Sequence, residues 1–225
     1  MLDALINGLN DYSIDERGDV GSWIRVACIQ GLTDIADLFF RVLGLGSQSQ
    51  GNNQVITAQL ESYLPVEKFH TIVAGVLKQG VEKLDNVRQE AGVCFMKLIS
   101  LALPDDNELD RWRLHGVKLL TELFPRWVID YSILYKIKCA ISFRASEERH
   151  GWNDANWLFP RAVRLLEIGS YRKHVLSGIV MSIGSRTDST VSATYYVVLW
   201  CRYKCYFSSK RQLQTALLNL LRLYL

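Results

Sequence analysis

The chain has 225 residues, of which 49% are apolar and 22% are charged, the balance of a folded soluble protein rather than a disordered one. No stretch reaches the roughly 18 consecutive apolar residues that a membrane span needs, and the first residues lack the basic region and apolar core of a secretory signal. The five cysteines are odd in number and irregularly spaced, so we expect free thiols in a reducing compartment.

Charge is divided unevenly along the chain. Residues 1–125 carry 11 Lys+Arg and 17 Asp+Glu, a net charge of −6, whereas residues 126–225 carry 15 and 6, a net charge of +9. A basic half of this kind is typical of a partner-binding face, but charges that merely solvate helix surfaces give the same sum.

The apolar periodicity predicts helices joined by short turns, and no segment before residue 126 shows the sustained alternation of a strand. Proline and polar residues separate the apolar runs. The expected helices cover residues 2–11, 22–43, 54–63, 66–79, 86–103, 108–124 and 159–168, then a turn and helix within 169–184, a further helix capped by residues 187–189, and a last helix over 210–225.

A polar stretch containing two glycines, residues 11–21, precedes the longest of these helices. Asp19 or Ser22 can cap that helix, because either side chain can accept a hydrogen bond from a free N–H of its first turn. Arg25 lies near the apolar side of the helix, where a guanidinium needs a partner. Asp19 is the obvious candidate for that partner, and an acid of a neighbouring repeat is the alternative.

The same arrangement recurs 63 residues later, as Glu82 and Arg88. For Arg88, Glu82 or Asp85 is the expected partner. At this offset Cys28 coincides with Ala91, Leu32 with Phe95, and Ile35 with Leu98. A weaker echo, residues 189–192, has serine in place of the arginine. An acid before a helix and an Ile-Arg or Val-Arg step inside it are typical of HEAT-type repeats, in which they form a polar ladder. The pattern predicts a repeat with a structural ladder of Asp19, Arg25, Glu82 and Arg88, although two amphipathic helices can also align by chance.

These features predict an all-α fold, an α-solenoid of stacked antiparallel helix pairs of the HEAT or armadillo type, forming one C-terminal HEAT-like domain over residues 1–225. A solenoid offers large surfaces and few pockets. It therefore favours binding over catalysis.

The sequence contains no recognisable catalytic, cofactor-binding or metal-binding arrangement. Its histidines are widely separated, and Cys201 and Cys205 lack a second pair of ligands nearby. There is no Gly-x-Ser-x-Gly elbow and no Gly-Lys-Ser/Thr step. Basic and aromatic residues mix within residues 195–210, but no dense Lys/Arg stripe supports nucleic-acid binding. We expect a protein that is not an enzyme and needs no cofactor.

Four blocks of the chain, in order, resemble the C-terminal region of the tubulin-folding cofactor D family. Residues 11–25, DYSIDERGDVGSWIR, resemble the most recognisable motif of that family. Residues 82–88 resemble its EKIDxxR helix, residues 159–161 its FPR step, and residues 171–190 its YRxxVLxGxVxSxGxxTxST block. The resemblance spans about residues 11–192, and the first and last blocks are the specific ones.

The resemblance implies a cytoplasmic HEAT-repeat chaperone of the microtubule cytoskeleton. The family binds β-tubulin, cooperates with tubulin-folding cofactors C and E and an Arf-like small GTPase, and assembles and disassembles the αβ-tubulin dimer. It promotes GTP hydrolysis by tubulin only together with its partners. The alternative function is that of a generic HEAT or armadillo scaffold, such as a transport receptor or a phosphatase regulatory subunit. An RNA-binding helical repeat is a third interpretation, which rests on the basic second half alone.

Five residues are candidates for partner binding: Arg17, Tyr171, Arg172, Lys173 and His174. Positive side chains are unfavourable at the start of a helix, where the helix dipole is itself positive, so we expect Arg172 and Lys173 to face a carboxylate cluster of a partner. Solvated surface charge is the competing interpretation.

Two segments, residues 127–143 and 195–207, have no counterpart in the family pattern. Both are rich in tyrosine and in β-branched residues. We interpret them as lineage insertions or as noncoding sequence translated in error.

Overall fold

The computed structural model describes residues 1–46, 53–101, 109–124 and 151–183, and within these ranges almost all regular structure is helical. The elements are α1 (Leu2–Gly8), β1 (Ile14–Asp15), β2 (Gly18–Asp19), α2 (Gly21–Gly46), α3 (Asn53–Tyr63), α4 (Val66–Gln79), α5 (Asp85–Ile99), the 3-10 helix η1 (Leu109–Trp112), α6 (Val117–Leu123), α8 (Ala155–Leu165) and α9 (Gly169–Ile183). The prediction of an all-α helical solenoid is confirmed.

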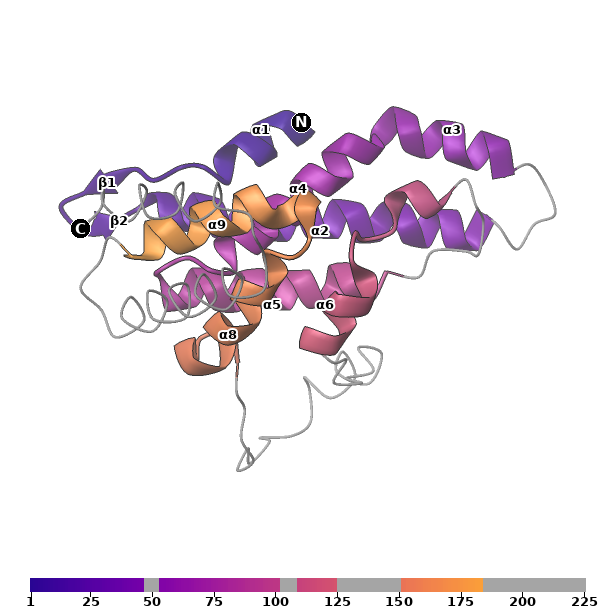
Figure 1. Ribbon diagram of the computed structural model, residues 1–225. Coiled ribbons are helices and arrows are strands. Elements are labelled where there is room, and N and C mark those ends of the chain that lie inside the picture. The colour runs from indigo at the N-terminus through magenta and orange to yellow at the C-terminus, as the bar shows by residue number, and fades with distance from the viewer. Residues whose placement is uncertain (47–52, 102–108, 125–150, 184–225) are drawn as a thin grey trace, which may run out of the picture.

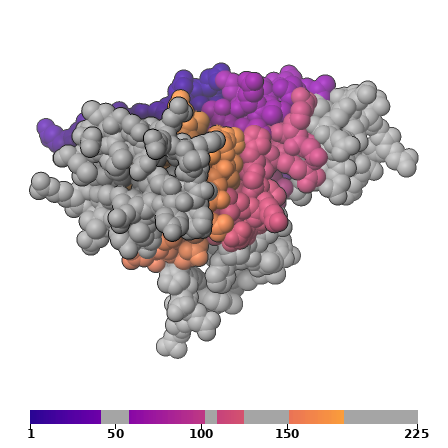
Figure 2. All heavy atoms as spheres, in the orientation of Figure 1, coloured from indigo at the N-terminus to yellow at the C-terminus, as the bar shows by residue number. Residues whose placement is uncertain are grey.

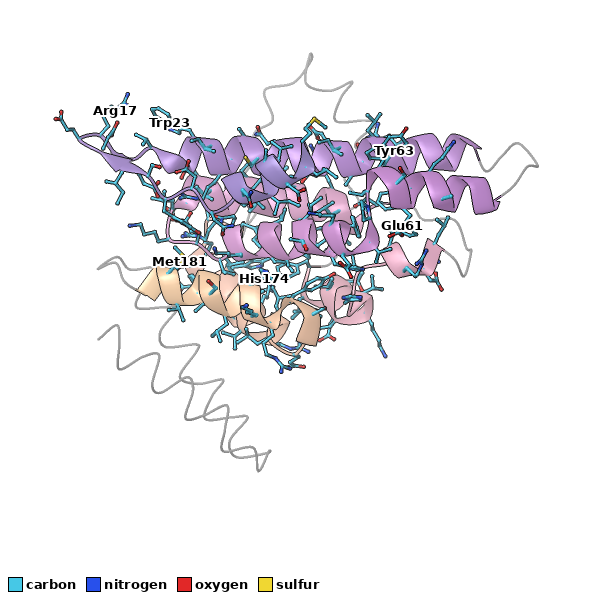
Figure 3. The ribbon with its side chains drawn as sticks, turned by 90° about the horizontal axis from the view of Figure 1, so that it is seen from above. Arg17, Trp23, Glu61, Tyr63, His174 and Met181 are labelled. Atoms are coloured by element: carbon cyan, nitrogen blue, oxygen red, sulfur yellow. The ribbon has the colours of Figure 1, made fainter. Side chains whose placement is uncertain are left out.

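The helices pack in two layers. Seen from above, α4 lies between α2 and α9 (Figure 3). In Figure 1, α5, α6 and α8 lie beneath them, with α5 packed against both α2 and α4. The core lies between these layers because each helix turns an apolar stripe inward. In α4 the buried stripe includes Phe69, Ile72, Val73, Val76 and Leu77.

A small hairpin is the main departure from the predicted helical pattern in the first part of the chain. β1 and β2 pair antiparallel, with Ile14 opposite Asp19 and Asp15 opposite Gly18. The sequence pattern predicts only helices and turns here, so the hairpin is an addition that the structure reveals. Strands of two residues are too short to produce a readable alternation of apolar and polar side chains.

The single helix predicted over residues 108–124 is also wrong, because the structure divides it into η1 and α6. Gly116 adopts a left-handed conformation, with φ of 68°, immediately before α6. An α-helix cannot continue through a residue in this conformation. The backbone turns here, so that His115 comes to lie beside Tyr171 of α9.

The start of α8 also differs from the sequence prediction. The sequence predicts a helix that begins at residue 159. In the structure α8 starts at Ala155, and Pro160 falls in its second turn. Asp154 caps the helix by accepting hydrogen bonds from the backbone N–H groups of Asn156 and Trp157, at 2.9 and 3.4 Å. An aspartate cap satisfies first-turn donors that would otherwise lack partners, so the helix begins there.

The internal repeat predicted between the segments that form α2 and α5 has matching burial. Leu32 and its equivalent Phe95 are fully buried, and Cys28 and its equivalent Ala91 also belong to the core, whereas Ile35 is only partly buried where its equivalent Leu98 is buried. The two helices pack against each other, as adjacent units of a repeat do. The weaker echo at residues 189–192 lies outside the described residues, as do residues 127–143 and 195–207.

Candidate functional site

The polar stretch before α2 is fixed by its own hydrogen bonds. Asp11 Oδ1 accepts from the backbone N–H of Ser13 at 2.9 Å. Asp19 Oδ1 accepts from the backbone N–H of Ser22 at 3.0 Å, and the Ser22 hydroxyl donates to the Asp19 carbonyl at 2.6 Å. Asp19 is thus the capping residue of α2, one of the two that the sequence offered.

Arg25 is the centre to which this stretch is attached. Its side chain is fully buried, and its guanidinium donates to Asp19 Oδ2 at 2.9 Å and to Glu82 Oε1 at 3.1 Å. It also donates to the Asp11 carbonyl at 2.6 Å and lies over the ring of Tyr12, 4.3 Å from its centroid. One buried cation therefore joins the hairpin region, α2 and the turn after α4.

The two carboxylates that meet Arg25 differ in their electrostatics. The hydrogen bond from Arg25 lowers the pKa of Asp19, which is close to the surface. Burial raises the pKa of Glu82, and the nearby positive charge of Arg25 offsets this effect only in part. Glu82 Oε2 is buried and has no hydrogen-bond partner among the described residues. The Arg25–Asp19 pair is therefore the favourable ion pair, and Glu82 is the carboxylate that is costly to ionise.

Arg88, the equivalent of Arg25 in the second unit, is bound differently. It is fully buried and donates to the backbone carbonyls of Glu82 at 2.8 Å, Lys83 at 2.7 Å and Trp152 at 3.2 Å. Its ion pair is with Asp85. The carboxylate of Glu82 points away from Arg88 toward the first unit, so this acid connects two units rather than serving its own.

These four ladder residues are held inside the scaffold. Arg25 pairs with Asp19 and Glu82, and Arg88 is bound by Asp85 and by backbone carbonyls, an arrangement that fixes the packing of helices. Within the ranges that the structure describes, no group of three or more His, Cys, Asp or Glu side chains could hold a metal ion. None of the helices in those ranges combines the length and the apolar character needed to cross a membrane.

Arg17, a candidate for partner binding, lies at the tip of the hairpin. It forms an exposed ion pair with Asp15 at 2.6 Å. Its guanidinium carbon lies 5.5 Å from the centroid of the Trp23 ring, and that ring is 63% exposed. Figure 3 shows both side chains at the end of the molecule where α2 begins. Arg17 is thus accessible, next to an exposed aromatic ring.

Tyr171 is placed where it cannot meet a partner in this conformation. Its side chain is fully buried, and its hydroxyl accepts a hydrogen bond from the backbone N–H of His115 at 3.1 Å. Burial raises the pKa of Tyr171 to about 12. Its role is therefore to attach α9 to the turn before α6. The sequence placed Tyr171 in an exposed cluster because an aromatic residue at a helix start gives no sign of which way it points.

The three residues that follow Tyr171 in α9 separate into different roles. Arg172 donates through Nε to the carbonyl of Leu166 at 2.7 Å, just past the end of α8. A cation at a helix C-terminus is favourable, which explains this arginine without a partner protein. Lys173 is exposed, and His174 is partly buried. Burial lowers the pKa of His174, and the positive charges of Lys173 and Lys78 lower it further.

The structure brings together two histidines that the sequence analysis treated as unrelated. The rings of His70 and His115 are stacked, with centroids 3.9 Å apart and planes 9° from parallel. The residues are far apart in the chain, and their spacing carries no signal of contact. Only the turn at residues 115–116 brings the second ring onto the first.

A family model described as "Tubulin folding cofactor D C terminal" matches residues 70–223, more than half of the chain. The chain belongs to this family. The resemblance read from the sequence is thereby confirmed. The matched range begins after the DYSIDERGDVGSWIR stretch and includes residues 127–143 and 195–207. Whether those two segments are insertions stays a prediction.

A curated relative supports membership of the tubulin folding cofactor D family. "Tubulin-specific chaperone D" of Dictyostelium discoideum is 23% identical to the chain over 201 residues, which is 89% of this chain and 12% of that protein. The chain therefore spans a small part of the length of this relative. No solved structure matches the chain.

Proposed function

We propose that this chain is a tubulin-folding chaperone module that binds β-tubulin and takes part in the assembly and disassembly of the αβ-tubulin dimer. The observation that carries the proposal is the match to the cofactor D C-terminal family over residues 70–223. The relative named as a tubulin-specific chaperone is in agreement. Because the chain corresponds to 12% of the length of that relative, the activity of the longer protein is attributed to this chain only as part of the proposal.

The module acts by presenting a surface rather than by chemistry of its own. Stacked helices fixed by buried ion pairs keep their outer faces in one arrangement, which lowers the ordering cost of binding a large client. GTP hydrolysis by tubulin is promoted only when cofactors C and E are also present, and an Arf-like small GTPase is a further partner. The module works in the cytoplasm, on the tubulin of the microtubule cytoskeleton.

The candidate contact residues of this module are the exposed cations, Arg17 on the hairpin and Lys173 on α9. Both are accessible in the structure. Tubulin surfaces are acidic, as the family resemblance implies, and the second half of the chain has a net charge of +9. Complementary charge of this kind raises association rates and makes them sensitive to salt.

Binding of purified tubulin to the immobilised chain tests the proposal. We expect saturable retention of β-tubulin. We also expect tubulin to release phosphate faster with the chain and cofactors C and E together than with the chain alone or with the two cofactors alone. A helical-repeat protein of similar size and charge is the matched control. Retention of β-tubulin no greater than that of the control would contradict the proposal, and binding of transport cargo or of a phosphatase catalytic subunit instead would favour the generic scaffold.

A further inference from the structure

A cluster of three aromatic side chains joins α9 to the rest of the described molecule. His70 of α4 stacks on His115, which precedes α6, and both rings lie close to Tyr171 of α9. The centroid of the Tyr171 ring is 6.5 Å from that of His70 and 5.7 Å from that of His115. Figure 2 shows the surface of α9, in orange, adjoining that of residues 109–124, in rose. The cluster therefore lies where three separate parts of the chain meet.

The hydrogen bonds in this cluster have one consistent direction. His70 Nε2 lies 2.9 Å from the carbonyl of Arg111, which can only accept, so Nε2 carries the proton. His70 Nδ1 is then the acceptor, 3.4 Å from the Tyr171 hydroxyl. That hydroxyl in turn accepts from the backbone N–H of His115. A proton added to His70 Nδ1 would face the hydroxyl of Tyr171 and take away the acceptor of that hydroxyl.

Charge on either ring acts across the stack. The side chain of His115 is exposed, but its neighbours remove part of its hydration, and this lowers the pKa of His115; the positive charge that His70 can carry lowers it further. The nearby charged groups include the guanidinium of Arg111, which lies 3.7 Å from Glu61 of α3, and Glu67, one turn before His70 on α4. On α9 the groups after Tyr171 are the cation Lys173 and the imidazole of His174. Protonation of one imidazole is therefore opposed by the other.

We propose that the stacked pair of His70 and His115 is a proton-sensitive latch that holds the first turn of α9 against α4 and the turn before α6. While both rings are uncharged, they stack and Tyr171 completes the hydrogen-bonded chain. Proton uptake places a cation against the second ring and breaks the chain at Tyr171. The first turn of α9 is then released, while the core formed by α2, α4 and α5 keeps its buried ladder.

The sign of the effect follows from the lowered pKa of His115. The unfolded or released state has the ordinary histidine pKa of 6.5 and binds a proton first, so the latched state is fully favoured above that pH and loses stability as pH falls. Uptake of one proton changes the latch equilibrium by at most about tenfold per pH unit. His174, whose pKa is also lowered by burial, adds an effect of the same sign and has to be separated in the test.

Amide hydrogen exchange of the full chain at several pH values, corrected for the intrinsic pH dependence of exchange, tests the latch. We expect protection of the Tyr171 and Arg172 amides, which donate to the Ile168 carbonyl, to fall several-fold between pH 7.5 and pH 5.5, by less than the one-proton limit of about tenfold per pH unit. The double variant His70→Gln/His115→Gln should remove most of this pH dependence and leave only the smaller part that His174 contributes. His174→Gln is the matched control and should keep most of the pH dependence.

A permanent charge tests the same idea without a change of pH. His115→Lys should lower protection of the same two amides at pH 7.5 to the level that the natural chain shows at pH 5.5. The latch is overturned if the natural chain shows no loss of protection at low pH, if His70→Gln/His115→Gln retains the full loss, or if His115→Lys leaves the first turn of α9 fully protected at pH 7.5.

Discussion

At the scale of single residues, the buried guanidinium of Arg25 is the feature that most constrains the structure. It has two carboxylate partners from different parts of the chain, Asp19 before α2 and Glu82 after α4. Removing one member of a buried ion pair leaves the others without compensation, which costs more than an exposed pair contributes. Arg17 provides the contrast, because it makes an ion pair of similar length at the surface.

We expect Arg25→Ala to lower the free energy of unfolding by about 3–5 kcal/mol, because it leaves a buried glutamate unpaired. This exceeds the roughly 1–3 kcal/mol expected for a single unsatisfied polar group. The matched control is Arg17→Ala, which should cost less than about 1 kcal/mol. Urea denaturation of the two variants decides the matter, and equal midpoints for both would show that the Arg25 cluster does not hold the fold together.

The pH dependence of Glu82→Gln forms a second prediction at this scale. The pKa of Glu82 is raised by burial, so its stabilising contribution is present below the ordinary pKa of 4.5 and is lost as pH rises through its folded value. Glutamine does not ionise, so the variant does not lose stability in this way as pH rises. The stability of Glu82→Gln relative to the natural chain should therefore increase from pH 4 to pH 7, as measured by urea denaturation at each pH. A constant or decreasing difference would mean that Arg25 fully compensates the buried carboxylate.

At the scale of elements, α4 and α9 approach each other closely although they are distant in the chain. A Cβ placed on Gly178 would lie 2.3 Å from the backbone carbonyl oxygen of Lys78 and 2.6 Å from a methyl group of Val81. Backbone atoms cannot move aside as a flexible side chain can. The absence of a side chain at residue 178 is therefore what lets the two helices approach.

Gly178→Ala should push α9 away from α4 and lower the free energy of unfolding by about 1–3 kcal/mol, the usual cost of overpacking. Gly169→Ala in the same helix is the control, because a Cβ there meets nothing within 4 Å. Alanine is the better helix former, so the control should be neutral or stabilising by up to about 1 kcal/mol. Thermal unfolding followed by circular dichroism measures both, and a Gly178→Ala protein as stable as its control would refute the close approach.

At the scale of the whole molecule, the division of charge is tied to the proposed client. The first half is acidic and the second half is basic. The charged side chains of the buried ladder all belong to the first half, near α2 and α5. Arg172 has a structural task at the end of α8. Lys173 is exposed as Arg172 is, but it does not share that structural task and is therefore the cleaner probe of an electrostatic contact.

Lys173→Glu should weaken association with tubulin and flatten its dependence on salt, with helix content unchanged, because exposed charges act through a screened field. Arg41→Glu is a control with the same change of charge on α2, where Arg41 is exposed and pairs only locally with Asp37. Tubulin binding measured across a salt series separates the two. Wild-type affinity of Lys173→Glu at low salt, or equal weakening by Arg41→Glu, would remove this surface from the proposed interface.

The sequence by itself determined the helical architecture, the position of the α2 start and the membership of the chain in its family. These properties depend on local patterns: apolar residues at helical spacing, an acid one turn ahead of a helix, and motifs read in order. The bounds of α4 came out as predicted, because Pro65 and Gly80 mark its ends in the sequence.

Only the tertiary structure decided which charges meet and which side chains are free. Glu82 turned from its own repeat to Arg25 across 57 residues, and Tyr171 turned inward to meet His115. The left-handed Gly116 broke an expected helix and stacked His115 on His70. Helical periodicity states that a residue faces inward or outward, but the partner it finds there depends on how separate helices cross. That crossing is set by long-range packing, which local spacing does not encode.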